Sequence, residues 1–406
     1  MKRVSLVILL TACATTPAPA FVPYTPMPGT AEAVAYDAGL THYLGQTRVT
    51  STSTDTRGVT TYAFDPASGP ICMRGAPYRA ATRQGSSDEL MIFLQGGGAC
   101  WSDFCFAITT APAGIPTTDL TSTDASMNPL ATADLLYLPY CDGSLFAGEA
   151  DIDENGDGTP DRIQHGLANL SAALEVGYAQ FPHPSRVVLA GSSGGGFGTI
   201  LAVFLVRYVY PDVPIVVLDD AGIGIAHPDR PAFVHDLLAE FGALAFVPSD
   251  CTDCIADGNV TGLVEYALAH DPDLRVAAIS SEYDYVISHV FLGLDPTLFQ
   301  TTLVSATGAI QARHPDTYRR FFYPGDAHTT LLGSITGLTG SDLGHVEIPP
   351  DIASNLASIH LESIHTATAR GVLLADWLRA ELDGDRAGSA DVVDDPGPLP
   401  SWATMP

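Results

Sequence analysis

Basic residues are scarce in this sequence, and long apolar runs are missing beyond its N-terminus. Lys2 is the only lysine, and 18 lysine and arginine residues stand against 46 aspartate and glutamate residues, a formal net charge of -28. That charge argues against nucleic acid and anionic lipid surfaces as partners. A membrane-spanning helix needs about 18 uninterrupted apolar residues. No internal stretch approaches that length, so no spanning helix is expected.

The N-terminus predicts export. A basic pair and a short apolar run, residues 2–10, lead into Leu10-Thr11-Ala12-Cys13, which resembles a bacterial lipobox. We therefore expect a signal peptide over residues 1–12 and a lipid anchor on Cys13, the only contact with a membrane. Residues 13–30, rich in Thr, Pro and Ala, are interpreted as a tether on the outer membrane or cell surface. The alternative is cleavage after Ala20, which would give a secreted protein.

The cysteine count agrees with an oxidising compartment. Six of the seven cysteines remain when Cys13 is set aside, an even number that suits three disulfides. The local pairs are Cys100 with Cys105 and Cys251 with Cys254, which leaves Cys72 to pair with Cys141. The sequence alone allows fifteen connectivities. The two-residue spacing of the second pair also suits redox or metal chemistry, but no second paired-cysteine element accompanies it, so a structural bridge is favoured.

The stretch Gly191-Ser192-Ser193-Gly194-Gly195 follows an apolar run and precedes a helix-periodic one. A strand, a sharp turn and a helix in this order present a nucleophilic serine, and the small flanking residues let chain and substrate approach. Ser193 is the central serine. Ser192 fits less well, because its frame would place Ala190 where the first glycine belongs. A plain structural turn is the alternative interpretation.

Apolar runs and helical periodicity predict an α/β fold. Further expected strands lie at residues 59–64, 78–82, 90–94, 135–138, 186–190, 214–218, 275–280 and 320–323. Helix-periodic apolar residues precede and follow the serine strand, as crossover connections between parallel strands require. We expect an α/β-hydrolase-like domain with a central, mostly parallel sheet and helices on both faces.

This catalytic domain is expected as one unit over residues 31–384. Residues 225–270 are predicted to be a helical segment that covers the cleft, and the last amphipathic helix is predicted to end at Gly384. Residues 385–406, rich in Asp, Gly and Pro, are interpreted as a disordered acidic tail. We expect a monomer.

Two more strand ends carry groups that acyl transfer needs. Asp284 follows the strand at 275–280, and His328 follows the strand at 320–323, so the chain order is serine, acid, histidine. That order is typical of α/β-hydrolases. Residues 96–98, three glycines directly after another strand, can direct backbone N–H groups at an oxyanion together with the N–H of Gly194.

Each of these roles has a competitor. Asp219 and Asp220 also end a strand, although Asp284 is better placed directly before the histidine strand. His289 is too close in sequence to Asp284 to come from another loop, and His314 lies at an expected helix end before a proline. His328 is therefore the predicted base.

The residues resemble the pectin acetylesterase family, which includes plant pectin acetylesterases and Notum-like carboxylesterases. The resemblance rests on MIFLQGGGACW, YLPYCDGSLFAGE, GSSGGG, DDAG, SSEYD and DAH, in order from about residue 55 to 335. It implies an α/β-hydrolase fold and ester hydrolysis without a cofactor. It also implies a triad of Ser193, Asp284 and His328 and an oxyanion hole of Gly97, Gly98 and Gly194.

The sequence departs from the family's pattern around the substrate. Trp101 follows Cys100 where plant members place the aromatic before the cysteine, Ile287 replaces a glutamine, and Ala327 and Thr329 flank the histidine in place of cysteine. We therefore predict a serine esterase that removes acetyl or other short acyl groups, and a glycan such as pectin is an analogy. Alternatives are a polyester depolymerase, feruloyl esterase or peptidase, or a non-catalytic surface binding lipoprotein.

One acidic segment follows the pattern of a calcium loop. The expected ligands stand at alternate positions, namely Asp153, Asn155, Asp157, the carbonyl of Thr159 and Asp161. Gln164 occupies the twelfth position, where a bidentate glutamate is usual. A structural calcium ion is expected here, with a plain solvated loop as the alternative.

Overall fold

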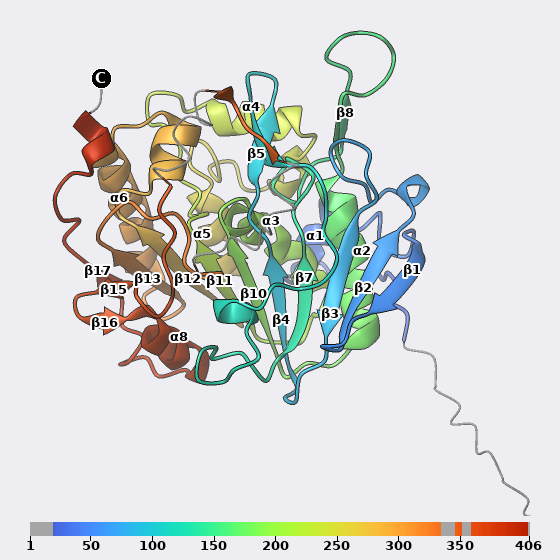
Figure 1. Ribbon diagram of the computed structural model, residues 1–406, viewed down its shortest axis with the longest axis horizontal. Helices are drawn as coiled ribbons and strands as arrows, with labels where there is room; N and C mark the ends of the chain where they lie inside the picture. Colours follow the sequence, from blue (N-terminus) through green and yellow to red (C-terminus); the bar gives the residue numbers. More distant parts are fainter. Residues whose placement is uncertain (1–18, 334–345, 351–358, 405–406) are drawn as a thin grey trace, which may run out of the picture.

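The computed structural model describes residues 19–333, 346–350 and 359–404. The expected signal peptide and Cys13 lie outside these residues. The central sheet has ten strands in the order β1-β2-β3-β7-β4-β10-β11-β12-β13-β17, and Figure 1 shows them crossing the molecule from β1 to β17. Their bounds are Val49–Thr54, Val59–Phe64, Arg79–Arg83, Asp134–Leu138, Glu89–Leu94, Arg186–Ser192, Ile215–Asp220, Leu274–Ser281, Tyr318–Tyr323 and Val392–Val393 in that order.

All strands from β7 to β17 run parallel, and β1, β2 and β3 add an antiparallel edge. Along the parallel strands, successive side chains pack alternately into two different apolar clusters. In β10, Val187 and Leu189 join the larger apolar cluster, and Val188 and Ala190 join the smaller one. Both faces are therefore buried, which explains why the sequence shows continuous apolar runs here rather than alternation.

Helices cover both faces of the sheet. The main ones are α2 (Gly166–Gln180), α3 (Gly194–Val209), α5 (Thr261–His270), α6 (Pro296–Arg313) and α8 (Leu374–Asp383). Trp377 and Leu378 of α8 belong to the smaller core, whereas Leu201 and Leu205 of α3 belong to the larger one. The architecture predicted from the sequence, a mostly parallel sheet between helical layers, is confirmed.

Smaller elements lie around this frame. They are α1 (Ala33–Asp37), α4 (Phe233–Glu240), the π-helical segment η4 (Val286–Leu292), β5 (Gly98–Trp101), β6 (Phe104–Ile108), β14 (Val346–Glu347), β8 (Ala150–Ile152), β9 (Arg162–Gln164), β15 (Thr368–Ala369) and β16 (Val372–Leu373). The hairpin of β8 and β9 carries a loop that projects from the body of the molecule in Figure 1.

The strand order reverses between β4 and β10. After β4 the chain adds β7 on one side of it and then returns to place β10 on the other side. Ligands of open α/β sheets bind at such a switch point, beyond the carboxyl ends of the strands. Gln95 and Gly96 follow β4, and Ser193 follows β10, so the topology brings the glycine loop and the serine to one crevice.

The C-terminal tail differs from the sequence prediction. Residues 385–404 are ordered: β17 pairs with β13, and the Trp402 indole N–H donates to Asp326 at 2.9 Å. Asp391 accepts from both the backbone and the guanidinium of Arg320. The prediction of disorder was wrong because these contacts are tertiary, and local composition does not reveal them.

The expected tether also packs against the domain where it is described. Tyr24 stacks on Tyr208 of α3, with ring centroids 4.7 Å apart, and its backbone N–H donates to the Tyr208 hydroxyl at 2.7 Å. Residues 19–30 therefore lie on the protein surface, contrary to the prediction of a free tether. Aromatic stacking offsets the conformational entropy that a flexible linker would keep.

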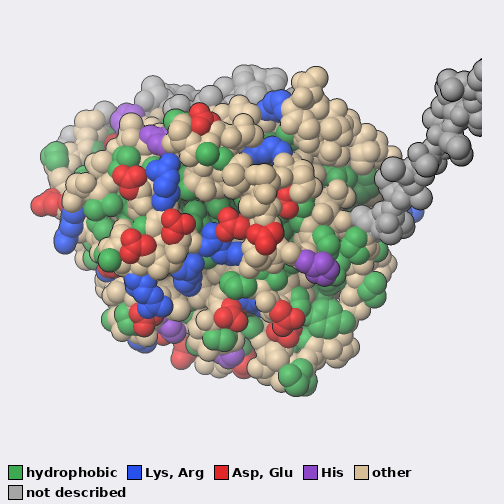
Figure 2. Space-filling model, turned by 90° about the horizontal axis from the view of Figure 1, so that it is seen from below, with side chains coloured by type: hydrophobic (Ala, Val, Ile, Leu, Met, Phe, Trp, Pro, Cys, Tyr) green, Lys and Arg blue, Asp and Glu red, His purple; other side chains and the backbone are tan. Residues whose placement is uncertain are grey.

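The three disulfides pair as expected: Cys72 with Cys141, Cys100 with Cys105 and Cys251 with Cys254. Within the described ranges, no helix is long and apolar enough to cross a membrane. Figure 2 shows acidic side chains interspersed with basic ones over one face.

Candidate active site

Ser193 lies at the turn between β10 and α3 in a strained backbone conformation. Its φ is 57° and its ψ is -123°, a region that non-glycine residues rarely occupy. Its backbone N–H donates to the carbonyl oxygen of Asp220 at 2.8 Å, and its side chain is close to buried. The hydroxyl of Ser192 instead donates to the Asp220 carboxylate at 2.8 Å. The Ser192 hydroxyl is therefore already hydrogen-bonded to Asp220, whereas Ser193 occupies the turn itself.

The structure brings Asp284 and His328 together, although 44 residues separate them. Nδ1 of His328 lies 3.0 Å and 2.9 Å from the two carboxylate oxygens of Asp284, which is fully buried. The backbone N–H of Ile287 also donates to Asp284, at 2.9 Å. This arrangement fixes the ring so that Nε2 is the nitrogen left for another partner.

None of the competing residues occupies these positions. Burial raises the pKa of Asp219 to about 8, so its carboxyl group is not a ready anion near neutral pH. Asp220 contacts the backbone after the histidine rather than the imidazole. His289 stacks on Tyr285 and Trp402, and His314 is the C-cap of α6.

The glycines of residues 96–98 meet the serine turn as predicted. Gly98 has a φ of 85°, and a Cβ there would lie 1.8 Å from the carbonyl oxygen of Phe106, so no side chain is tolerated. A Cβ on Gly97 would lie 2.3 Å from the ring of Tyr140. A Cβ on Gly194 would lie 3.6 Å from the backbone nitrogen of Gly98, so the two backbones are neighbours.

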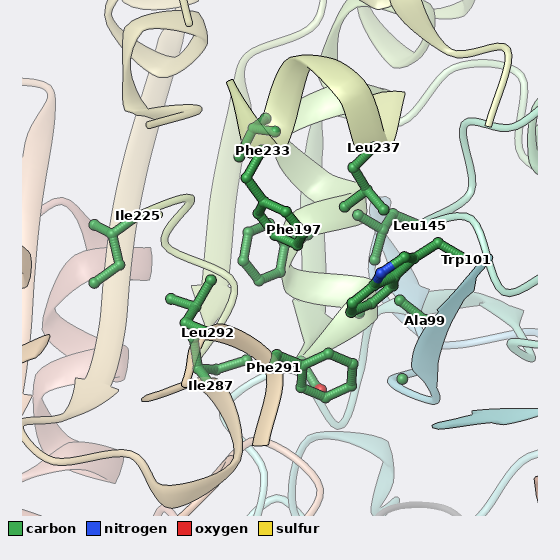
Figure 3. A pocket seen from close by; sticks show the side chains of 14 residues that line it. Ala99, Trp101, Leu145, Phe197, Ile225, Phe233, Leu237, Ile287, Phe291 and Leu292 are labelled. Carbon is green, nitrogen blue, oxygen red and sulfur yellow. The ribbon is translucent and has the colours of Figure 1, made fainter. Parts of the chain in front are cut away.

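A narrow apolar cavity of about 60 Å³ begins at Ser193 and Gly194. Aromatic and aliphatic side chains from α3, α4, η4, the β5–β6 hairpin and two loops converge on it in Figure 3: Ala99, Trp101, Leu145, Phe197, Ile225, Phe233, Leu237, Ile287, Phe291 and Leu292. Helix α4 lies in the segment expected to cover the cleft, and it forms one wall of this cavity. The cavity could not be predicted from the sequence, because its lining comes from six separate regions of the chain.

A second cavity, of about 360 Å³, opens on the other side of Ser193. Ser193, His328 and Gly96 to Gly98 line it together with apolar residues that include Phe106 and Leu332. Ser193 and Gly98 border both cavities. A carbonyl group bound at Ser193 would therefore have one substituent in the narrow cavity and the other in the second cavity, which His328 lines.

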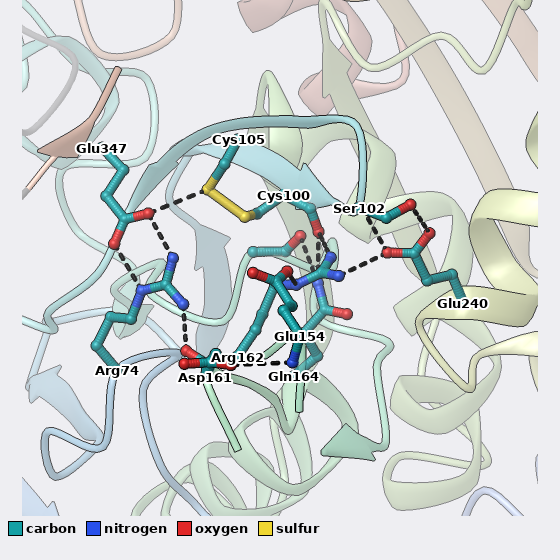
Figure 4. Close-up of a disulfide and its surroundings, with 11 residues drawn as sticks. Arg74, Cys100, Ser102, Cys105, Glu154, Asp161, Arg162, Gln164, Glu240 and Glu347 are labelled. Atoms are coloured by element: carbon teal, nitrogen blue, oxygen red, sulfur yellow. Dashed lines mark hydrogen bonds and ion pairs between the residues drawn. A yellow bond between two sulfur atoms is a disulfide. The ribbon is translucent and has the colours of Figure 1, made fainter. Parts of the chain in front are cut away.

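The β5–β6 hairpin that separates the two cavities is braced from below (Figure 4). Arg162 is fully buried, donates to the carbonyl oxygen of Cys100 at 2.7 Å and pairs with Glu154 and Glu240. Gln164 donates to the same carbonyl at 2.7 Å. The disulfide of Cys100 closes the hairpin. The sequence gives no signal for this role of Arg162, because two of its partners, Cys100 and Glu240, are more than 60 residues away.

The expected calcium loop joins β8 to β9 and is held by its own hydrogen bonds. Asp153 accepts from the backbone N–H groups of Gly156, Asp157 and Gly158, and Asp161 accepts from those of Glu154 and Asn155. Asn155 accepts from Asp157, which accepts from Thr159.

The loop carboxylates do not converge in this arrangement. Among the described residues, the one set of three acidic, histidine or cysteine ligand atoms within 4.8 Å is Cys100, Cys105 and Glu347, whose sulfurs form a disulfide. Gln164 points away into the core. The loop geometry thus does not form a ready set of ligands, and calcium binding stays a prediction.

The chain is similar to known proteins in sequence and in fold. Residues 52–233 match the pectinacetylesterase family. The resemblance predicted from the sequence is thereby confirmed. The structure of the Wnt deacylase Notum from Drosophila is similar at a TM-score of 0.56 and 15% identity, covering 86% of this chain and 97% of that one.

At that identity the likeness to Notum establishes the α/β-hydrolase fold. None of the curated proteins matches this sequence. The pectinacetylesterase match supports a carboxylic-ester hydrolase.

Proposed function

We propose that this protein is an exported serine carboxylesterase that uses Ser193, His328 and Asp284. The observation that carries the proposal is the pair of contacts between His328 Nδ1 and the buried Asp284 carboxylate, at the same cavity as Ser193. A histidine oriented by a carboxylate beside a serine at a strained turn is the arrangement that activates a neutral hydroxyl.

The reaction follows from the roles of these groups. Nε2 of His328 takes the proton of the Ser193 hydroxyl as the oxygen attacks the ester carbonyl, and Asp284 stabilises the imidazolium. Backbone N–H groups of Gly97, Gly98 and Gly194 stabilise the tetrahedral oxyanion. The imidazolium then protonates the leaving alcohol, and water activated by the same nitrogen releases the acid. The chemistry needs no cofactor.

The narrow cavity suggests the size of the acyl group. Its volume is about 60 Å³, and a water-sized group needs roughly 10–15 Å³. An acyl chain of about four to six carbons is therefore the best match, longer than the acetyl group that the family description suggests. Acetylated pectin remains the second candidate, supported by that description alone, and acetate release from it is the direct test.

We predict that p-nitrophenyl hexanoate is hydrolysed with a higher kcat/KM than the acetate. Leu237→Trp narrows the cavity from α4, so hexanoate should lose about tenfold in kcat/KM while acetate changes little. His235→Trp, on the exposed side of the same helix, is the matched control and should leave both values unchanged. Preference for acetate, or equal losses for both esters in Leu237→Trp, would contradict this assignment of the cavity.

Export is proposed on two grounds. The lipobox-like residues before Cys13 suggest a cell-envelope lipoprotein, and three disulfides suit an oxidising compartment. Mass spectrometry of the mature N-terminus distinguishes an acylated Cys13 from a free terminus after Ala20.

Calcium is proposed as a structural ion of the β8–β9 loop, on the strength of its alternating oxygen residues. We expect calcium to raise Tm by a few degrees over a chelator-treated sample, because an ion bound only by the folded protein stabilises it. Asp157→Asn should abolish this increase, whereas Asp229→Asn, at another exposed position, should keep it. An equal Tm with and without calcium in the unmodified protein would remove the ion from the account.

A further inference from the structure

Asp220 is a fully buried carboxylate that the esterase mechanism does not use. It ends β11, the strand next to the serine strand, and is fully enclosed between the serine turn and the histidine loop. Burial raises the pKa of its carboxyl group, and hydrogen bonds from Leu331, Thr330 and Ser192 act in the opposite direction. A buried carboxylate is costly unless it is fully hydrogen-bonded, so its contacts show what it is placed to hold.

The contacts of Asp220 join two separate parts of the active site. On one side its carbonyl oxygen accepts from the Ser193 N–H at 2.8 Å, and its Oδ2 accepts from the Ser192 hydroxyl at 2.8 Å. On the other side Oδ2 accepts from the N–H groups of Thr330 and Leu331 at 2.8 and 2.9 Å. Its Oδ1 lies 3.1 Å from the Thr330 hydroxyl.

The histidine loop needs such a support. Thr329, directly after His328, has a φ of 69°, a conformation that a β-branched residue rarely adopts. Conformations of this kind persist only when surrounding contacts fix them. Asp220 holds the next two residues, and the carbonyl of His360 accepts from the His328 N–H at 2.7 Å. The backbone of His328 is thereby fixed on both sides.

We propose that Asp220 is a positioning residue that fixes the His328 loop relative to the Ser193 turn through its side-chain hydrogen bonds. This inference rests on the proposed function, because it concerns the distance between the nucleophile and its base. Asp284 orients the imidazole ring, whereas Asp220 sets the position of the backbone that carries it. Two buried carboxylates thus share the placement of one histidine.

The test compares Asp220→Asn with Asp220→Ala. Asparagine can place its carbonyl where Oδ2 accepts three hydrogen bonds and its amide where Oδ1 meets the Thr330 hydroxyl, so it keeps the contacts without the charge. Alanine removes all four. Asp219→Asn is the matched control, since Asp219 is equally buried on the same strand but accepts from Gly222.

Two readouts are needed. The first is the low-field proton resonance of the His328 imidazole N–H bonded to Asp284, identified by its loss in His328→Gln. The second is kcat and KM for p-nitrophenyl butyrate. We expect Asp220→Ala to lose the resonance and about 10²-fold in kcat with little change in KM, since a shift of about 1 Å costs that much. Asp220→Asn and Asp219→Asn should retain both.

A folded Asp220→Ala protein with the resonance and kcat of the unmodified enzyme would overturn the proposal. So would an Asp220→Asn protein as impaired as Asp220→Ala, because charge rather than position would then be the cause. If Asp220→Ala does not fold, Ser192→Ala/Thr330→Val removes both hydroxyl donors and should lower kcat by about tenfold; an unchanged kcat would then overturn the proposal. The resonance reports on His328 and Asp284 even if Ser193 is not the nucleophile, so the two proposals fail separately.

Discussion

Ser193→Ala should lower kcat for p-nitrophenyl butyrate by about 10⁶-fold, because it removes the atom that forms the acyl-enzyme. The substitution deletes one oxygen and keeps the rest of the side chain, so the fold and Tm should be retained. The measurement is steady-state kinetics with thermal unfolding on the same preparation.

Ser192→Ala is the matched control for this experiment. It also removes one hydroxyl, from the adjacent residue, but that hydroxyl donates to the Asp220 carboxylate. Its expected loss in kcat is small beside that of Ser193→Ala. If Ser193→Ala retained activity at the level of the unmodified protein, the assignment of the nucleophile would be rejected.

Asp284→Asn should lower kcat by about 10⁴-fold while preserving the fold. The Ile287 N–H needs an acceptor, so the asparagine carbonyl stays at the Oδ1 position and the amide takes the Oδ2 position, 2.9 Å from Nδ1 of His328. The amide donates at the shorter of the two contacts, which favours Nδ1 as the acceptor and the proton on Nε2. A protonated Nε2 cannot take the proton of Ser193.

The control for Asp284→Asn is Asp219→Asn, a second buried carboxyl group that has no contact with the imidazole. It should leave kcat close to that of the unmodified enzyme. Equal losses in the two variants would indicate a general effect of altering buried carboxyl groups, and the assigned role of Asp284 would then be lost.

The sequence predicted those features whose signals are local. The strands at 90–94 and 186–190 are continuous apolar runs because both faces of the sheet are buried. The serine turn is recognisable because glycines flank the serine in the sequence. His328 and Asp284 could be selected because each follows such a run, and the carboxyl ends of parallel strands meet at one edge.

Other features depend on contacts between distant segments and could not be predicted. Arg162 braces Cys100 from 62 positions away, and the two-residue strand β17 is too short to give a periodic signal. Trp402 lies in a Pro-rich tail whose composition favours disorder, but its indole N–H donates to Asp326 in the folded protein. The role of Asp220 was also hidden, since a strand-end aspartate has the same local pattern whichever loop it holds.

Covalent labelling tests the central claim most directly. A fluorophosphonate reacts only with a serine that is activated as a nucleophile, and tryptic mass spectrometry locates the adduct. We expect one adduct, on Ser193, that is absent from Ser193→Ala and forms much more slowly in His328→Gln. An adduct on Ser192 or another serine, or no adduct in a preparation that hydrolyses esters, would contradict it.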